Sequence, residues 1–393
     1  MVHYQFATEE QINLADEARK ILEKELLPQI HDLELADGGL GKYPMDVHQV
    51  LADAGYFGMD IGEEWGGLGM NLVTRGVIAE EMAQVDAGFT FSFFSACGYW
   101  EAILATGLSK EEKQEWADRI MAGEAIGSFT FTEAEAGSDA LAMRTTAKKE
   151  GNEWVINGTK CFASNGPIAN YFIVTAWTDK TKKPSEGITT FLVEKERGVT
   201  IGKKENKLGI KLSETSEVVF DNVRVPEDHV VGEVGKGISK SLGQINFDGR
   251  SLGVTYNVGL AQACLNHAIE YAKTRRQFGK RIIDHQGIGF MIADMEARTQ
   301  ASRALTYSLL EQIDRGDRNV GYKPALTKMF VTDCTMQTAL DAVQVLGGYG
   351  YMKDYPVEKL LRDAKIFQIF SGTNQIQRKN IMKAIAGRDP LKK

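Results

Sequence analysis

The spacing of apolar residues changes twice along this chain, and that change limits the fold more than any other feature. Between Ile126 and Glu233, short runs rich in β-branched and aromatic residues, such as YFIVTAW and ITTFLVE, are separated by turn signals. On both sides of this segment, apolar residues recur at helical spacing. We therefore predict an α+β fold in which a small antiparallel sheet or β-barrel lies between two helical parts. The predicted domains are residues 1–125, 126–235 and 236–393.

The first predicted helix has a clear start signal. Thr8 and Gln11 have the spacing of a capping box, in which two side chains and two backbone N–H groups pair reciprocally. Behind them, apolar residues follow at helical spacing: Ile12, Ala15, Ala18, Leu22 and Leu26. The N-terminal part is therefore expected to begin with a helix just after Thr8.

Charge and cysteine usage exclude several classes of protein. A net charge of −7 argues against a broad nucleic-acid surface, which needs a basic footprint. The four cysteines have neither metal-site nor disulfide-framework spacing, which indicates a protein without a metal site in a reducing compartment. No signal peptide and no apolar run of membrane-spanning length is evident. We expect a cytoplasmic protein that has neither a nucleic-acid nor a membrane partner.

Common nucleotide and hydrolase motifs are missing from the sequence. No GxGxxG lies between a strand and a helix, no GxxxxGK[ST] is present, and no GxSxG occurs. Three other stretches are more informative: FTEAEAGSDA (131–140), KTRRQFGKRIIDHQ (273–286) and the segment 341–377, which begins DAVQVLGGYGYMKDY. Without a known family for comparison, the second stretch could equally be a solvent-exposed helix end. Gly347-Gly348 in the third could equally be a helix terminator.

These stretches resemble the acyl-CoA dehydrogenase family over essentially the whole chain. The matching motifs, in order, are TEAEAGSD, INGTKCFASNG, KLGIKLSETSEVVFDNVRVPEDHVVG, TRRQFGK followed by HQ, QVLGGYGYMKDYPVEKLLRDAKI and SGTNQIQ. The resemblance implies an N-terminal helical domain, a middle β-barrel domain and a C-terminal four-helix bundle. It also implies a homotetramer that carries one FAD per subunit, binds an acyl-CoA substrate and passes electrons to electron-transfer flavoprotein.

The resemblance also implies which residues bind FAD. One set borders the flavin ring or its pyrophosphate: Phe131, Thr132, Ser138, Phe162 and Ser164. A second set belongs to the FAD of a neighbouring subunit: Arg275, Phe278, Gln344, Gly347, Gly348, Thr373 and Gln375. Arginine suits a pyrophosphate because its planar guanidinium can bind two oxygen atoms at once.

Dehydrogenation of an acyl thioester needs a base that removes the α-proton, while the flavin accepts the hydride. Most family members carry a glutamate immediately before the Gly-Thr of the C-terminal motif, and this chain has Ser371 there. A minority carry the base just before the helix arginine, and this chain has Gly249 there. A serine hydroxyl is not ionised near neutral pH, and the local sequence offers it no histidine partner. The chain therefore lacks both usual bases.

Three positions are candidates for an unusual base. Asp248 is one residue from the minority position, so it faces the acyl group only if the helix is locally displaced; otherwise it is a helix-surface or CoA-proximal residue. Asp86 precedes a run of aromatic residues, and its alternative role is structural or capping. Some relatives that act on cyclic enoyl-CoA thioesters use an aspartate from this helix, at a position nearer Thr90.

The resemblance assigns five residues to the acyl-CoA thioester: Ser138, Phe91, Phe94, Arg250 and Gly372. If Phe91 and Phe94 face the pocket rather than the core, the pocket is short, flat and apolar, which suits a short or cyclic acyl group. The helix that carries them has no arginine, which disfavours the dicarboxylyl and sulfinyl substrates that other members hold with one.

Three functions remain open from the sequence. The leading hypothesis is an FAD-dependent dehydrogenase of a short or cyclic acyl- or enoyl-CoA, with hydride transfer to flavin N5 and a non-standard base. The second keeps the fold and both ligands but is a lyase such as a desulfinase, or an enoyl-CoA reductase. The third is a non-catalytic relative that binds FAD and CoA, in which Ser371 marks lost activity.

Overall fold

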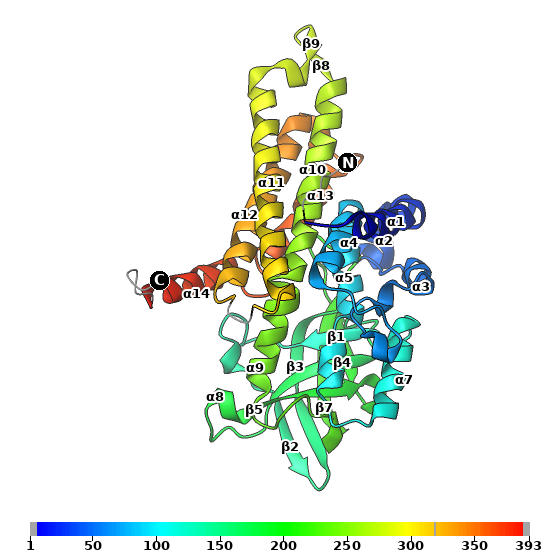
Figure 1. Cartoon of the computed structure of the whole chain (residues 1–393), viewed down its shortest axis with the longest axis vertical. Coiled ribbons are helices and arrows are strands. Elements are labelled where there is room, and N and C mark those ends of the chain that lie inside the picture. The colour runs from blue at the N-terminus through cyan, green and yellow to red at the C-terminus, as the bar shows by residue number, and fades with distance from the viewer. Residues whose placement is uncertain (1–5, 318–319, 388–393) are drawn as a thin grey trace.

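A computed structural model of the protein describes residues 6–317 and 320–387 (Figure 1). The N-terminal part is helical as predicted. The predicted capping box is confirmed, because the Thr8 hydroxyl accepts from the Gln11 backbone N–H and the Gln11 side chain accepts from that of Thr8. The helices of this part are α1 (Glu9–Glu25), α2 (Ile30–Gly39), α3 (Met45–Asp53), α4 (Leu72–Val85), α5 (Ala87–Cys97), α6 (Trp100–Leu104) and α7 (Lys110–Met121).

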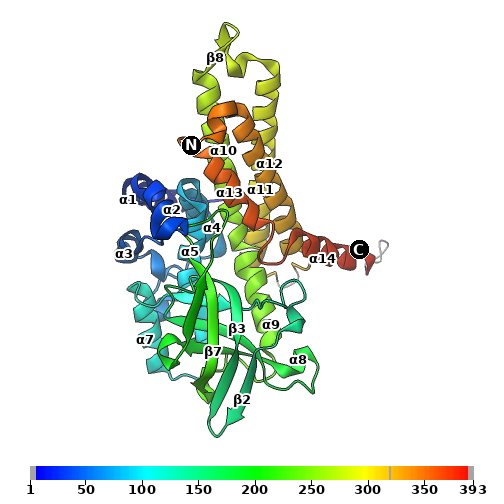
Figure 2. The same ribbon diagram turned by 180° about the vertical axis from the view of Figure 1, so that it is seen from behind.

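The middle part is a curled seven-stranded sheet (Figure 2). Its strands are β1 (Gly127–Thr130), β2 (Thr146–Glu150), β3 (Glu153–Ser164), β4 (Tyr171–Trp177), β5 (Ile188–Glu194), β6 (Thr200–Lys204) and β7 (Thr215–Pro226), with the short helix α8 (Pro184–Gly187) before β5. They pair in the order β1-β4-β2-β3-β7-β6, and β5 pairs with β4. Strand β4 is buried on both faces, which explains its unbroken apolar run. The sheet is not purely antiparallel as predicted, since β4 pairs in parallel with both β1 and β2.

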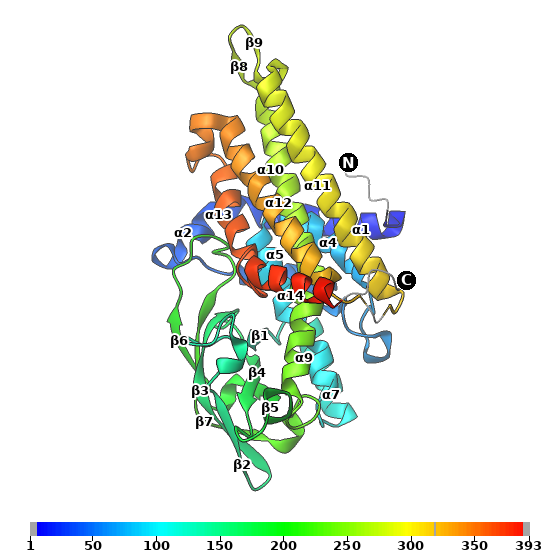
Figure 3. The same ribbon diagram turned by 90° about the vertical axis from the view of Figure 1, so that its left-hand side faces the viewer.

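The C-terminal part is a bundle of long helices that extends away from the sheet (Figure 3). Helix α9 (Gly237–Gln244) continues as one π-helical turn (Ile245–Gly249) before the bundle begins. The bundle helices are α10 (Thr255–Thr274), α11 (Gln286–Asp314), α12 (Lys323–Leu346) and α13 (Val357–Phe367), and α14 (Asn374–Ala386) projects sideways at their foot. A hairpin of β8 (Arg276–Gln277) and β9 (Lys280–Arg281) forms the far tip. None of the helices within residues 6–317 and 320–387 is long and apolar enough to cross a membrane.

Helix α4 is the centre of the helical packing, and it carries a buried polar network. Glu80 is fully buried and accepts hydrogen bonds from Arg303 Nε at 2.8 Å and Tyr307 Oη at 2.9 Å, both on α11. Arg303 also donates to Gln262 of α10 at 2.8 Å. Burial raises the pKa of Glu80, and Arg303 opposes that rise. These hydrogen bonds therefore connect helix α4 of the N-terminal part to helices α10 and α11 of the bundle.

Replacing Glu80 with alanine is expected to lower the free energy of unfolding by about 3–5 kcal/mol, because it leaves the buried Arg303 without its carboxylate. The matched control is Glu17→Ala, which removes an exposed ion pair with Lys20 and should change stability by no more than about 1 kcal/mol. Urea unfolding of both variants measures the difference. Equal losses in the two variants would show that the network does not stabilise the packing of α4.

Candidate active site

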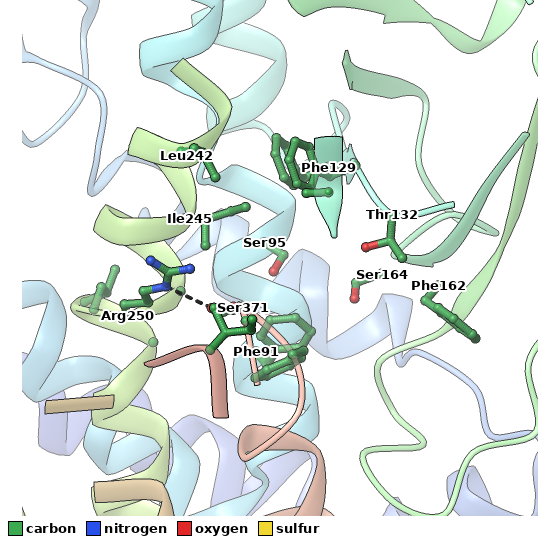
Figure 4. A pocket seen from close by; sticks show the side chains of 18 of the residues that line it. Phe91, Ser95, Phe129, Thr132, Phe162, Ser164, Leu242, Ile245, Arg250 and Ser371 are labelled. Atoms are coloured by element: carbon green, nitrogen blue, oxygen red, sulfur yellow. Dashed lines mark hydrogen bonds between the residues drawn. The ribbon is translucent and has the colours of Figure 1, made fainter. Parts of the chain in front are cut away.

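A cavity of about 450 Å³ lies where the three parts of the chain meet (Figure 4). Helices α4 and α5 border it from the N-terminal part, the ends of β1 and β3 from the sheet, and the π-helical turn from the C-terminal part. The segment between α13 and α14, which holds Phe370, Ser371 and Gly372, closes another side. A cavity of this size, mostly apolar with a few polar groups, is typical of a small-molecule site.

One wall of the cavity is aromatic. Phe91 contacts Phe370 with ring centroids 4.9 Å apart, and Phe94 contacts Tyr256 at 5.7 Å. All four residues line the cavity. On the sheet side, Phe129 stacks against Phe131 at 5.8 Å. These rings give the cavity a flat, apolar border.

The two positions at which the resemblance places a base, 371 and 249, lie against each other. Ser371 of the α13–α14 segment faces Gly249, and a Cβ atom on Gly249 would lie 2.3 Å from Ser371 Oγ. Ser371 has a left-handed backbone (φ 53°) and so does Gly372 (φ 84°). Because the turn lies so close to Gly249, any larger residue at position 249 would displace Ser371. Both usual base positions therefore hold small, uncharged residues.

Two cationic side chains and one amide hold this turn in place. Arg250 Nε donates to the Ser371 carbonyl at 2.9 Å, which Figure 4 marks with a dashed line. Lys328 Nζ and Gln377 Nε2 donate to the Gly372 carbonyl at 3.0 and 2.8 Å. Burial, together with the charge of Arg250, lowers the pKa of Lys328 to about 7. Because both carbonyls accept from these donors, the backbone of the turn is held in place.

No carboxylate lines the cavity among the side chains that the structure describes. Asp86 is fully buried and caps α5, accepting from the Phe89 N–H at 2.6 Å and from Lys359 Nζ at 2.6 Å. Thr90 is also buried and donates to the Asp86 carbonyl, away from the cavity lining. The side chain of Asp248 lies outside the described part of the chain, but its backbone forms part of the π-helical turn.

The predicted flavin-facing residues lie together on the sheet side of the same cavity: Phe131, Thr132, Ser138, Phe162 and Ser164. An irregularity in the β3–β7 pairing between Lys160 and Ala163 accompanies a left-handed backbone at Phe162, whose ring is 63% exposed. An exposed aromatic ring beside three hydroxyl groups fits a flat, polar-edged cofactor such as FAD. No cluster of three or more metal-binding side chains occurs in residues 6–317 and 320–387.

A buried ion pair fixes the strand end that carries Phe131 and Thr132. Lys160 Nζ donates to Glu133 at 2.8 Å and to the Phe131 carbonyl at 3.2 Å. Glu133 in turn accepts from the Thr145 N–H at 3.1 Å. Burial lowers the pKa of Lys160, and the charge of Glu133 opposes this. These contacts hold the chain where it passes the cavity.

The remaining predicted cofactor residues lie elsewhere. Arg275, Phe278, Gly347 and Gly348 line a separate, more open cavity of about 700 Å³ beside the β8–β9 hairpin. Phe278 is 94% exposed, and no atom lies within 4 Å of a Cβ placed on either glycine. Gln344 is exposed near the end of α12, Thr373 caps α14 by accepting from the Ile376 N–H, and Gln375 is exposed in the first turn of α14. Arg275, Phe278, Gly347 and Gly348 thus lie at a different cavity from the flavin-facing set, whereas Thr373 and Gln375 are next to Gly372 and Ile376 of the first cavity.

Several cavity residues were missed by the sequence analysis, among them Arg75, Ser95, Phe129, Tyr256 and Phe370. Helix α5 has no arginine, as noted from the sequence, but Arg75 of the preceding helix α4 lines the cavity. Arg75 is only 4% exposed and pairs with Asp60. A lone arginine in the apolar run LVTRGVIA was the signal available, since a buried charge usually has a specific partner.

Comparison with known proteins assigns the family. Three family models match in succession: the acyl-CoA dehydrogenase N-terminal domain at residues 8–124, the middle domain at 128–223 and the C-terminal domain at 235–386. The chain belongs to the acyl-CoA dehydrogenase family. An acyl-CoA dehydrogenase of Bacillus subtilis is 39% identical over 383 residues, which cover 97% of this chain and 99% of that protein.

Two further relatives are informative. The cyclohex-1-ene-1-carbonyl-CoA dehydrogenase of Syntrophus aciditrophicus is 36% identical over 375 residues, covering 94% of this chain and 88% of that protein. The solved structure of butyryl-CoA dehydrogenase from Megasphaera elsdenii matches with a TM-score of 0.90 and 34% identity, covering 98% of this chain and all of that one. Membership of this acyl-CoA dehydrogenase family implies an FAD cofactor and oxidoreductase chemistry on an acyl-CoA.

Proposed function

We propose that the protein is an FAD-dependent dehydrogenase of a short or cyclic acyl- or enoyl-CoA thioester, and that it uses a non-standard base. The observation that carries this proposal is the cavity itself, in which an aromatic wall faces Ser371 and Gly249 at the two usual base positions. An aromatic wall suits a ring or a short acyl group, as in the cyclic substrate named for the Syntrophus relative. The absence of a glutamate at either position argues against ordinary fatty acyl-CoA oxidation.

Asp248 is the base that we propose. Of the two candidate aspartates, Asp86 is already held by Lys359 and by the N-terminus of α5. Asp248 lies in a π-helical turn, whose extra residue displaces the helix locally, and the next two residues, Gly249 and Arg250, line the cavity. Single π-helical turns occur frequently at functional sites. A local displacement of the helix is what the sequence analysis requires for Asp248 to face the acyl group and act as its base.

The bound FAD would accept a hydride at N5 from the β-carbon of the thioester. The protein would supply the rest: Thr132, Ser138 and Ser164 as hydroxyl groups beside the cofactor, Phe91 and Phe94 as the wall of the acyl pocket, and Arg250 and Gly372 beside the thioester. The separate cavity at Arg275 and Phe278 supports a homotetramer in which those residues reach a neighbour's FAD. Electron-transfer flavoprotein is the proposed electron acceptor, on the ground of family membership.

A second function, an acyl-CoA lyase or an enoyl-CoA reductase, is favoured by one observation. No carboxylate lines the cavity among the described side chains, and a reaction in which solvent protonates the product does not need one. Incubation of the FAD-loaded protein with thioesters, without any electron acceptor, separates the lyase from the dehydrogenase. A lyase turns over repeatedly under those conditions, whereas a dehydrogenase stops once its flavin is reduced.

Replacing Asp248 with asparagine is expected to slow anaerobic flavin reduction by cyclohex-1-enecarbonyl-CoA by about 10²–10⁴-fold, the usual contribution of a general base. The matched control is Asp86→Asn, which can still cap α5 but loses the charge that pairs with Lys359. It should lower the melting temperature and leave the rate within about threefold. If Asp86→Asn abolishes flavin reduction while Asp248→Asn retains it, Asp248 is not the base.

Replacing Ser371 with glutamate restores a carboxylate at the usual base position. Because the neighbouring residue is Gly249, the new side chain has room at the cavity. We expect this variant to reduce its flavin with butanoyl-CoA at least about 100-fold faster than the wild type does. Ser371→Gln, which has the same size without the charge, should not gain this activity. Equal rates for the glutamate and glutamine variants would mean that the missing base does not limit the wild-type protein.

A further inference from the structure

The guanidinium of Arg75 presents an unsatisfied donor beside the acyl cavity. Arg75 lines the cavity but is only 4% exposed, and Asp60 is its one hydrogen-bond partner among the described residues. Its Nε atom is buried and donates to nothing in that part of the chain. A buried donor without an acceptor is costly, so its retention at a ligand cavity points to an acceptor carried by the ligand.

A second polar group belongs to the end of α5 near which Arg75 is paired, since Asp60 lines a neighbouring cavity together with Gly98, the residue that caps α5. Ser95 also lines it, and in Figure 4 its hydroxyl is seen in the space bordered by Phe129 and Phe91. Ser95 follows Phe91 by four residues on α5, so it lies about 6 Å further along the helix from the contact between Phe91 and Phe370. The reacting carbon is expected next to Ser371, which follows Phe370. The polar groups are therefore several bonds away from the thioester.

The charge balance around Arg75 determines which kind of ligand atom can bind beside it. Arg75 is already paired with Asp60, whose side chain is itself largely buried. A carboxylate on the acyl group would bring a second negative charge to an arginine that Asp60 already neutralises. That carboxylate would also lose its own hydration on entering the cavity. A hydroxyl or keto oxygen can accept from Nε without adding charge.

We propose that Arg75 and Ser95 form a binding subsite for a neutral oxygen atom, a hydroxyl or keto group, at the end of the acyl group far from the thioester. This inference rests on the proposed function, since it takes the ligand to be an acyl-CoA. It narrows the substrate class from a short or cyclic acyl group to one that is oxygenated at its far end. Arg75 acts in it as a specificity-determining residue, with no part in proton or hydride transfer.

Non-reactive thioethers test this inference independently of turnover. The probes are S-(cyclohexylmethyl)-CoA, its 4-hydroxy derivative and its 4-carboxy derivative, and their dissociation constants for the FAD-loaded protein are measured by calorimetry. We expect the hydroxy compound to bind at least about tenfold more tightly than the unsubstituted one, because it satisfies a charged buried donor. The carboxy compound should bind least tightly.

Arg75→Lys keeps a cation for Asp60 and removes the Nε donor. In this variant the preference for the hydroxy compound should fall to within about threefold, while the dissociation constant of the unsubstituted compound stays the same. If Arg75→Lys fails to fold or to hold FAD, Ser95→Ala serves in its place and should lower the preference at least about threefold.

Several results would overturn the inference. Equal binding of the hydroxy and unsubstituted probes to the wild type would show that there is no oxygen subsite. An equal loss for both probes in Arg75→Lys would show that Arg75 is only structural. Tightest binding of the carboxy probe would show that the subsite takes an anion. Failure of all three probes to bind would instead reject the proposed function, and this inference with it.

Discussion

The contact between Gly249 and Ser371 is the constraint on which the site depends. A helix from the C-terminal part and the turn between α13 and α14 approach so closely there that a Cβ on Gly249 would lie 2.3 Å from the serine hydroxyl. The turn is held by its carbonyl groups, through Arg250, Lys328 and Gln377. This arrangement places two small residues, Gly249 and Ser371, side by side at the two positions where the resemblance leads us to expect a carboxylate.

The rest of the cavity has two different walls, one made by the N-terminal helices and one made by the sheet. Helix α5 contributes rings, and α4 contributes Arg75 behind them. The sheet contributes hydroxyl groups and the exposed ring of Phe162, held by the buried pair of Lys160 and Glu133. The acyl group is therefore expected to meet an apolar wall with a polar far end, and the cofactor a polar border.

Much of this could be predicted from the sequence, for physical reasons that differ between residues. The change of apolar period predicted the helical, sheet and helical order, and the spacing of Thr8 and Gln11 predicted a helix start. The parallel pairing of β1 and β4 was not predictable, because pairing depends on contacts between distant segments. Arg75 was missed for the same reason, since α4 and α5 border one cavity only after folding. The π-helical turn at Asp248 likewise has no local sequence signal.

The central claim is that a carboxylate outside the two usual positions serves the acyl group. A crystal structure of the FAD-loaded protein with a bound non-reactive cyclic thioether tests it most directly. The account predicts a carboxylate oxygen of Asp248 within about 4 Å of the carbon that corresponds to the reacting one, with Phe91 and Phe94 against the ring. A structure in which Asp248 points to solvent, and in which only the Ser371 hydroxyl lies near that carbon, would contradict it.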